Sequence, residues 1–474
     1  MTRKRNLMIM AGILVLLCCV IGIEKMVTRH TDSINSTDEV ILEVDQDTVT
    51  DISWTYDGDS LAFEKTDGSW YDSDDGDFPV NQDTMTDFLA CFEEVHATFI
   101  IEDVDDYSQY GLEDPQCTVT INTDDEEIVV SLGDYSTMDE QRYIEIGDGK
   151  VYMIEEDILE SVTTDRDDFM QQDETPSVAT LEKMTVTGGA SLNAVYDADG
   201  SYSYTDSYNY YNVDGKEYLS LDDTLVESYL STLDSVELTD YVTYTASDDD
   251  IEEYGLDDPA YTITIKGATE EDSDGEAWDI DFVLYIATVD EGSDSDDETV
   301  YARVGDSSII YQLSSDDYES LTACDYDDLR PTEVFSIEWS DVTSLSFEID
   351  GSTYDVDTMT WKEYKKTLKD DDDEEEADIV YLIDDQRVDF DTVTEAIEAL
   401  TINSFDDGGD TDTLEMSVTI NVDNDDYPSV TAEIYRYDGD DCLVVVDGET
   451  VGLMSRSSMA DLKEAVTSVT LGLE

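Results

Sequence analysis

Most of the chain consists of short segments in which apolar and polar residues alternate, and these segments predict β-strands. Residues 117–121 (Cys-Thr-Val-Thr-Ile) and 261–265 (Tyr-Thr-Ile-Thr-Ile) show the pattern clearly, and such alternation places every second side chain on one face of a strand. Between strands of this kind, apolar residues in the range 85–95 recur at intervals of three and four. That spacing predicts an amphipathic helix, which Asn81 or Asp83 would cap.

The same order of elements occurs three times along the chain. A second helical pattern covers residues 225–236 after Asp222, and a third covers residues 393–400 after Asp389 or Asp391. We therefore expect an α+β fold, in which an N-terminal transmembrane helix is followed by three repeated modules of mainly antiparallel strands with one main helix each. The modules are predicted at residues 49–175, 176–330 and 331–474, and the third is the most divergent.

A short signature, Tyr-Gly-Leu-x-Asp-Pro, occurs at residues 110–115 and again at residues 254–259, directly before the two strands named above. Its glycine supplies the left-handed conformation that ends a helical turn, and its leucine contacts an apolar residue of that turn. Its proline prevents the helix from resuming and keeps the chain extended. In the third module, residues 407–410 (Asp-Gly-Gly-Asp) stand in its place. The signature predicts structural roles for Gly111, Leu112, Pro115, Gly255, Leu256 and Pro259.

An apolar segment near the amino terminus predicts a membrane anchor. Residues 7–23 carry no charge and follow three basic residues at positions 3–5; a segment of this length can cross a bilayer, and basic flanks stay on the cytoplasmic side. We expect an anchor at residues 1–26 with a short cytoplasmic N-terminus, a tether at residues 27–48, and the bulk of the chain outside the cytoplasm. A cleaved signal peptide and a lipid-modified Cys18 or Cys19 are alternatives, although the small residues that such processing requires are missing.

The charge of the chain restricts its partners. Its 122 acidic side chains against 22 basic ones give a net charge of −100, which repels nucleic acid and anionic membrane surfaces. There are only two histidines, and the cysteines after the apolar segment show no metal-ligand spacing. Because the familiar nucleophile, phosphate-binding and zinc-protease motifs are also missing, we expect no enzymatic activity. A hydrolase that uses two carboxylates is the remaining enzymatic alternative.

One acidic segment follows the spacing of a calcium-binding loop. Glu270, Asp272, Asp274 and Asp281 occupy positions one, three, five and twelve of the EF-hand pattern, and calcium prefers such oxygen ligands. An EF-hand begins with Asp and ends with Glu, whereas this segment has the two exchanged and is expected between strands. It is a weak calcium candidate, the alternative being an acidic hairpin tip; otherwise we expect no cofactor.

A tyrosine-rich segment at residues 202–211 favours a second kind of ligand. Tyr202 and Tyr204 are expected on one face of a strand, where their rings could stack on sugars, although a half-exposed tyrosine strand needs no ligand. A surface binding module for glycan or divalent cations is therefore the alternative to a purely structural protein.

Three of these features together resemble a known bacterial family. The repeated Tyr-Gly-Leu-x-x-Pro motif before a threonine-rich strand, the Asp-Gly-Ser-Trp turn at residues 67–70 and the N-terminal apolar segment are similar to domain of unknown function 4340 (DUF4340). The resemblance implies a membrane anchor, and members often accompany ABC transporters of the gliding-motility type; no catalytic residues are assigned to the family. We expect a non-catalytic, membrane-anchored, extracytoplasmic accessory protein of an ABC-transporter-type envelope complex, with transporter subunits as partners.

Overall fold

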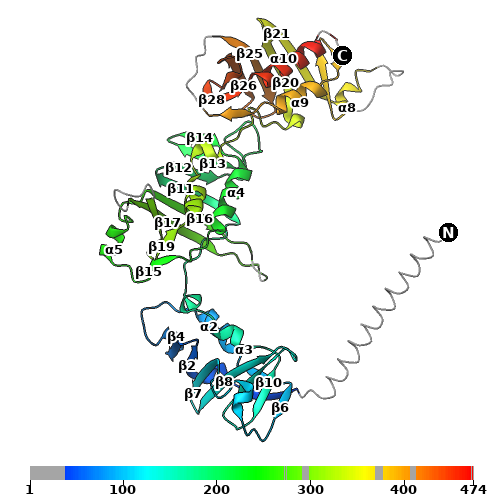
Figure 1. Cartoon of the computed structure of the whole chain (residues 1–474). Helices are drawn as coiled ribbons and strands as arrows, with labels where there is room; N and C mark the ends of the chain where they lie inside the picture. The colour runs from blue at the N-terminus through cyan, green and yellow to red at the C-terminus, as the bar shows by residue number, and fades with distance from the viewer. Residues whose placement is uncertain are drawn as a thin grey trace, which may run out of the picture. The chain divides into compact units, whose positions relative to one another are not determined.

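The computed structural model describes residues 38–470 and 472, except residues 272, 274, 291–297, 369–376 and 406–412. This part of the chain contains one sheet of two strands and three large antiparallel sheets of eight or nine strands (Figure 1). The chain divides into two compact units, and the boundary between them in the sequence falls between Gln172 and Asp173. The first unit holds one large sheet and the second holds the other two, and we call the three large sheets with their helices the first, second and third modules.

In the first module, the opening strand lies near the middle of the sheet, between its own hairpin partner and the strand that follows the signature. A separate pair, β1 (Glu39–Glu43) with β5 (Glu94–Ala97), includes part of the predicted tether. Two helices, α2 (Gln82–Ala90) and α3 (Ile158–Val162), accompany the sheet. The strand order is β4 (Ser69–Asp72), β3 (Asp59–Thr66), β2 (Val49–Tyr56), β7 (Cys117–Thr123), β8 (Glu127–Ser136), β9 (Gln141–Glu145), β10 (Val151–Ile154), β6 (Phe99–Ile101).

The second and third modules repeat this order and add one strand beyond the counterpart of β4. The second reads β14 (Glu217–Ser220), β13 (Tyr210–Asp214), β12 (Leu192–Tyr196), β11 (Thr180–Gly188), β16 (Tyr261–Ala268), β17 (Asp279–Asp290), β18 (Glu298–Val304), β19 (Ile310–Leu313), β15 (Tyr241–Thr243). The third reads β23 (Gln386–Val388), β22 (Ile379–Ile383), β21 (Ser352–Thr360), β20 (Val342–Ile349), β25 (Leu414–Val422), β26 (Ser429–Arg436), β27 (Asp441–Val446), β28 (Glu449–Ser455), β24 (Ile402–Ser404). The sequence limits of the three modules stay a prediction.

The helices predicted from apolar spacing have clear structural causes. Helix α2 begins after Asn81, whose Oδ1 accepts the backbone N–H groups of Asp83 and Thr84 at 3.0 Å each. In the second module, α4 (Asp223–Asp234) is capped in the same way by Asp222. Helix α9 (Asp391–Glu398) in the third module has no side-chain cap. In all three helices, the buried residues lie on the apolar face, which packs toward the core.

The predicted α+β class is wrong, because the described chain is mostly antiparallel sheet with few helices. Apolar spacing detects helices of several turns, whereas many short strands escape it. Among the described residues, no helix is long and apolar enough to cross a membrane. The longest of them, α10 (Arg456–Thr470), has 15 residues and spans about 22 Å, short of a hydrocarbon core of about 30 Å. The predicted anchor at residues 1–26 lies outside the described residues.

The signature forms a helix stop in both of its copies. Gly111 has a φ of 69° and Gly255 a φ of 71°, in the left-handed region that glycine adopts without cost. The next N–H closes the turn: Leu112 donates to the Tyr107 carbonyl at 3.1 Å, and Leu256 donates to the Ile251 carbonyl at 2.9 Å. Strands β7 and β16 begin a few residues later.

The two glycines differ in what surrounds them. A Cβ added to Gly111 would lie 2.6 Å from Cγ and 2.8 Å from the backbone nitrogen of Asp134, whereas one added to Gly255 would lie 3.5 Å from Ala287 and Val289. The first signature is therefore packed against its sheet more tightly than the second, and Gly111 has both a conformational and a steric reason to be glycine.

Replacing each glycine by alanine tests this difference. We expect Gly255→Ala to lower the free energy of unfolding by about 1 kcal/mol, the cost of a left-handed alanine, and Gly111→Ala to lower it by about 3 kcal/mol because a clash is added. Urea titration of each full-length variant, followed by circular dichroism, measures both values. Equal losses would contradict the steric part of the explanation.

Candidate functional site

A buried arginine joins four elements of the first module at one corner of its sheet. Arg142 on β9 is 5% exposed, and its Nε and Nη2 donate to the carboxylate of Asp157, the latter at 2.9 Å. Its Nη1 donates to Gln116 Oε1 at 3.2 Å and to the Gly133 carbonyl at 2.5 Å. Asp157 also accepts the N–H of Leu159 and so caps α3. Arg142 thereby connects the segment after the signature, the end of β8, β9 and the last helix.

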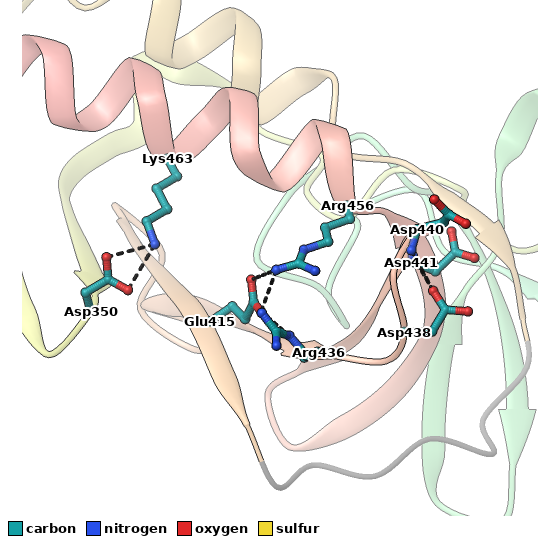
Figure 2. A network of polar contacts seen from close by, with 8 residues as sticks. All are labelled: Asp350, Glu415, Arg436, Asp438, Asp440, Asp441, Arg456 and Lys463. Carbon is teal, nitrogen blue, oxygen red and sulfur yellow. Dashed lines mark hydrogen bonds and ion pairs between the residues drawn. The ribbon is translucent and has the colours of Figure 1, made fainter.

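The third module has a charged cluster at the equivalent corner. Cys117 pairs with the end of β2, and Met416 pairs with the end of β20 in the same register, so Gln116 and Glu415 are equivalent. The side chain of Glu415 is 12% exposed and accepts Arg436 Nε at 2.7 Å and Arg456 Nη2 at 3.0 Å. Figure 2 shows both guanidinium groups directed at this one carboxylate. A carboxylate thus replaces the amide, and the arginines come from β26 and α10.

Neighbouring contacts extend this cluster along α10. The backbone N–H of Arg456 donates to the Asp440 carbonyl at 2.8 Å, and Asp438 Oδ1 accepts the N–H groups of Asp440 and Asp441 at 2.8 Å each. These two backbone hydrogen bonds lower the pKa of Asp438. About two turns further along α10, Lys463 pairs with Asp350 at 2.9 Å (Figure 2). The network therefore holds α10 against two separate turns of the sheet.

The second module fills the same corner with apolar side chains. Val300 pairs with Leu313 on β19 as Arg142 pairs with Ile154 on β10. Val300 is buried, and Ala260 directly precedes Tyr261 as Gln116 directly precedes Cys117. The fold therefore accepts either charged or apolar side chains at this corner. The charged residues there have a structural role and do not form a chemical site that the three modules share.

A pocket in the first module contains the residues most similar to a catalytic group. It has a volume of about 340 Å³ and is lined by Cys91, His96 and several carboxylates. His96 Nδ1 lies 2.7 Å from Asp38 Oδ1. However, burial raises the pKa of the Cys91 thiol to about 12, so the thiolate that nucleophilic attack requires is not formed at neutral pH. Within residues 38–472, as far as they are described, no three His, Cys, Asp or Glu side chains are grouped to hold a metal.

The structure describes only two of the four residues of the calcium candidate, so this site stays a prediction. Asp272 and Asp274 lie outside the described residues. Asp281 lies on β17 and pairs with Lys266 Nζ at 3.2 Å. The hairpin remains hydrogen-bonded as far as Thr269 and Trp278, three residues beyond Asp281, and Glu270 comes after it. Since a strand rises about 3.3 Å per residue, Asp281 is about 10 Å down the hairpin from Glu270.

A loop of the second module inserts a tyrosine into the core of the third. Tyr202 and Tyr204 lie in a turn between β12 and β13, so the expectation that they share a strand face is wrong. The ring of Tyr204 packs against the third module's core, and its Oη accepts the N–H of Ser336 at 2.9 Å. Asn424 Nδ2 donates to the Ser203 carbonyl at 3.3 Å. Burial raises the pKa of Tyr204 to about 12.

A second contact joins the end of the second module to the third. Arg330 Nη2 donates to the Val451 carbonyl at 2.7 Å, and its guanidinium lies 4.1 Å from the ring centroid of Phe405. Its Nη1 pairs with Asp327 at 3.0 Å. Tyr204 and Arg330 together form a junction that links two modules through partly buried side chains as well as through the chain itself.

Comparison with known protein families shows the family to which the chain belongs. The model of a domain of unknown function (DUF4340) matches residues 70–206 and 212–417, which is more than half of the chain. The chain belongs to the DUF4340 family. Both signature copies lie within the matched segments of this DUF4340 chain, and so does Tyr204. No curated protein and no solved structure matches it.

The residues that join elements in this DUF4340 protein were not predicted from its sequence. Arg142 and Glu415 occur in strands without a sequence motif, and their partners are distant in sequence. Tyr204 was singled out as a ring that could stack on sugars, not as a contact to Ser336. The one available signal is scarcity, because 22 basic residues among 122 acidic ones make each arginine within a strand unusual. An arginine in such a strand is expected to pair with a carboxylate, but the sequence does not identify which one.

Removing one side of the buried pair tests the role of Arg142. We expect Arg142→Ala to lower the free energy of unfolding by about 3–5 kcal/mol, because Asp157 is left without its partner. The double variant Arg142→Val with Asp157→Asn introduces the valine of the second module, removes the unpaired charge and keeps a side chain that can cap α3, so it should recover most of that loss. Urea titration measures both variants. A double variant as unstable as the single one would contradict the interpretation.

The phenol of Tyr204 should make the junction sensitive to alkali. An unfolded tyrosine ionises near pH 10, whereas the folded protein holds Tyr204 neutral up to a pKa of about 12. Its stabilising effect is therefore complete below pH 10 and falls as the pH rises toward 12. Tyr204→Phe should be less stable by about 1–2 kcal/mol at pH 8, since the Ser336 N–H loses its acceptor. Thermal unfolding should show this difference narrowing between pH 10 and 12, and a constant difference would contradict it.

Proposed function

We propose that this DUF4340 protein is a non-catalytic, extracytoplasmic accessory protein that contacts the subunits of an ABC-transporter-type envelope complex. The transporter as partner is supported by the family resemblance. The location is supported by the sequence pattern of residues 3–23, which lie outside the described part of the chain. The observation that carries the structural part of the proposal is the junction of Tyr204 and Arg330, because it makes two sheet modules act as one piece.

The use of charged residues supports a binding role over a catalytic one. Arg142, Glu415 and Arg330 each connect separate segments of the chain, so their hydrogen-bonding capacity is occupied by the fold. Cys91, in the pocket that most resembles a reaction site, has a pKa of about 12 because it is buried. Catalysis needs a base or nucleophile whose pKa is near the working pH. An accessory protein needs fixed geometry instead.

The junction supports a scaffold with a lasting shape. Interfaces between domains of one chain are commonly small and polar, so that relative motion is the usual expectation. Here the partly buried ring of Tyr204 packs against the core of the third module, and its hydroxyl accepts the N–H of Ser336. Loss of such a ring from a packed core costs about 3–5 kcal/mol. A partner that contacts both the second and third modules would therefore meet a surface that is already organised.

Affinity capture from detergent-solubilised membranes of the native cell tests the proposal. The full-length tagged chain should recover permease or ATPase subunits of an ABC transporter. Tyr204→Ala should reduce that recovery several-fold because the two modules separate, whereas Tyr204→Phe retains the ring and should retain the recovery. Tyr437→Ala is the matched control, since Tyr437 is 39% exposed on the third module.

Two outcomes would contradict the proposal. Recovery of the wild-type chain without any transporter subunit would remove the proposed partner. Resistance of the chain to protease added to intact cells, followed by degradation after lysis, would place it on the wrong side of the membrane.

A further inference from the structure

Two tyrosines of the second module form an exposed stack. The rings of Tyr202 and Tyr218 are nearly parallel, with an interplanar angle of 5° and centroids 3.6 Å apart. Tyr218 lies on β14, the last strand at its end of the sheet, and is 37% exposed. Tyr211 supports the stack from the core: it is fully buried, meets Tyr202 edge-on at 5.4 Å, and donates its hydroxyl to the Tyr208 carbonyl at 2.7 Å.

The junction brings a third tyrosine from the third module to this stack. Asn424 Oδ1 accepts the N–H groups of Asp426 and Tyr427 at 3.0 Å each, which fixes the turn between β25 and β26. The same side chain donates through Nδ2 to the carbonyl of Ser203, the residue after Tyr202, at 3.3 Å. Tyr427 is 39% exposed. A surface with rings from two modules therefore exists because the junction holds those modules together.

A hydrogen bond between the hydroxyl groups of Tyr202 and Tyr218 accompanies the stack and raises the pKa of Tyr202. Aromatic pairs favour offset or edge-on arrangements over a parallel sandwich, and Tyr202 and Tyr211 adopt the edge-on form. Tyr202 and Tyr218 instead lie face to face. Tyr218 and Tyr427 could both be polar residues at no cost to the core, because each is more than a third exposed. Their rings are therefore available to a ligand.

We propose that Tyr202, Tyr218 and Tyr427 form a platform that binds a neutral polysaccharide. The C–H faces of a sugar ring pack on aromatic faces. Phenol groups donate hydrogen bonds to the sugar hydroxyls and accept them, and carboxylates accept them. Asp197 is placed to be such an acceptor, since its Oδ2 accepts the Ser201 N–H at 2.9 Å beside Tyr202. With a net charge of −100, the protein repels an anionic polymer, and this selects a neutral glycan.

The platform is independent of the transporter contact, because it uses surface tyrosines that the accessory role does not require. Either proposal can fail while the other stands. A protein partner on the same surface would be detected as a loss of transporter capture in the platform variants without any binding of sugar.

Calorimetric titration of the full-length protein with soluble neutral oligosaccharides tests the platform, with hexamers of β-1,4-glucose, β-1,3-glucose and N-acetylglucosamine as probes. At least one hexamer should bind, and Tyr218→Ala and Tyr427→Ala should each weaken that binding by about tenfold. Tyr437→Ala should change it less than about twofold, because Tyr437 matches Tyr427 in exposure and module but lies on a different turn. Circular dichroism checks that each variant is folded.

Three results would overturn the proposal. They are flat titrations with all three hexamers, an equal loss of affinity in Tyr437→Ala, and tighter binding of polygalacturonate than of any neutral hexamer. Loss of transporter capture in Tyr218→Ala together with flat titrations would assign this surface to a protein and would also overturn it.

Discussion

The shortage of positive charge is the constraint on which the rest of this structure depends. With 122 acidic and 22 basic side chains, the compact state has to overcome strong self-repulsion. Arg142, Arg330 and Arg456 each lie where separate segments meet and interact there with a carboxylate, a carbonyl or both. Each neutralises local negative charge and also closes a joint between elements. The arginines are therefore concentrated where the fold would otherwise open.

The corner of the sheet shows how freely the chemistry varies when topology is kept. One position carries Gln116 in the first module, Ala260 in the second and Glu415 in the third. The order of the eight shared strands is the same in all three. A corner that works with an ion pair, with two arginines on one carboxylate and with valine is a packing solution. A functional site is better sought where a structural feature occurs in one module only, as with Tyr204 at the junction.

Helix caps and turns, which depend on neighbouring residues, were predictable from the sequence. Contacts between residues far apart in the sequence were not. Asn81 and Asp222 cap the helices that apolar spacing indicates, and Gly111 and Gly255 adopt the left-handed conformation that their motif requires. The balance between helix and sheet was misjudged, because strands of three or four residues carry too little alternation to be recognised. Tyr204 was assigned to a strand, since nothing in its neighbourhood indicates that its partner is Ser336, 132 residues away.

A set of charge-matched substitutions tests the role of the arginines most directly. Arg142→Gln, Arg330→Gln and Arg456→Gln each remove one positive charge, as do Lys183→Gln and Lys216→Gln at exposed positions. If the arginines act as joints, urea titration should show losses of about 2 kcal/mol or more for the three arginine variants and less than about 0.5 kcal/mol for the two lysine variants. Five equal losses would show that net charge alone matters, and would contradict the account.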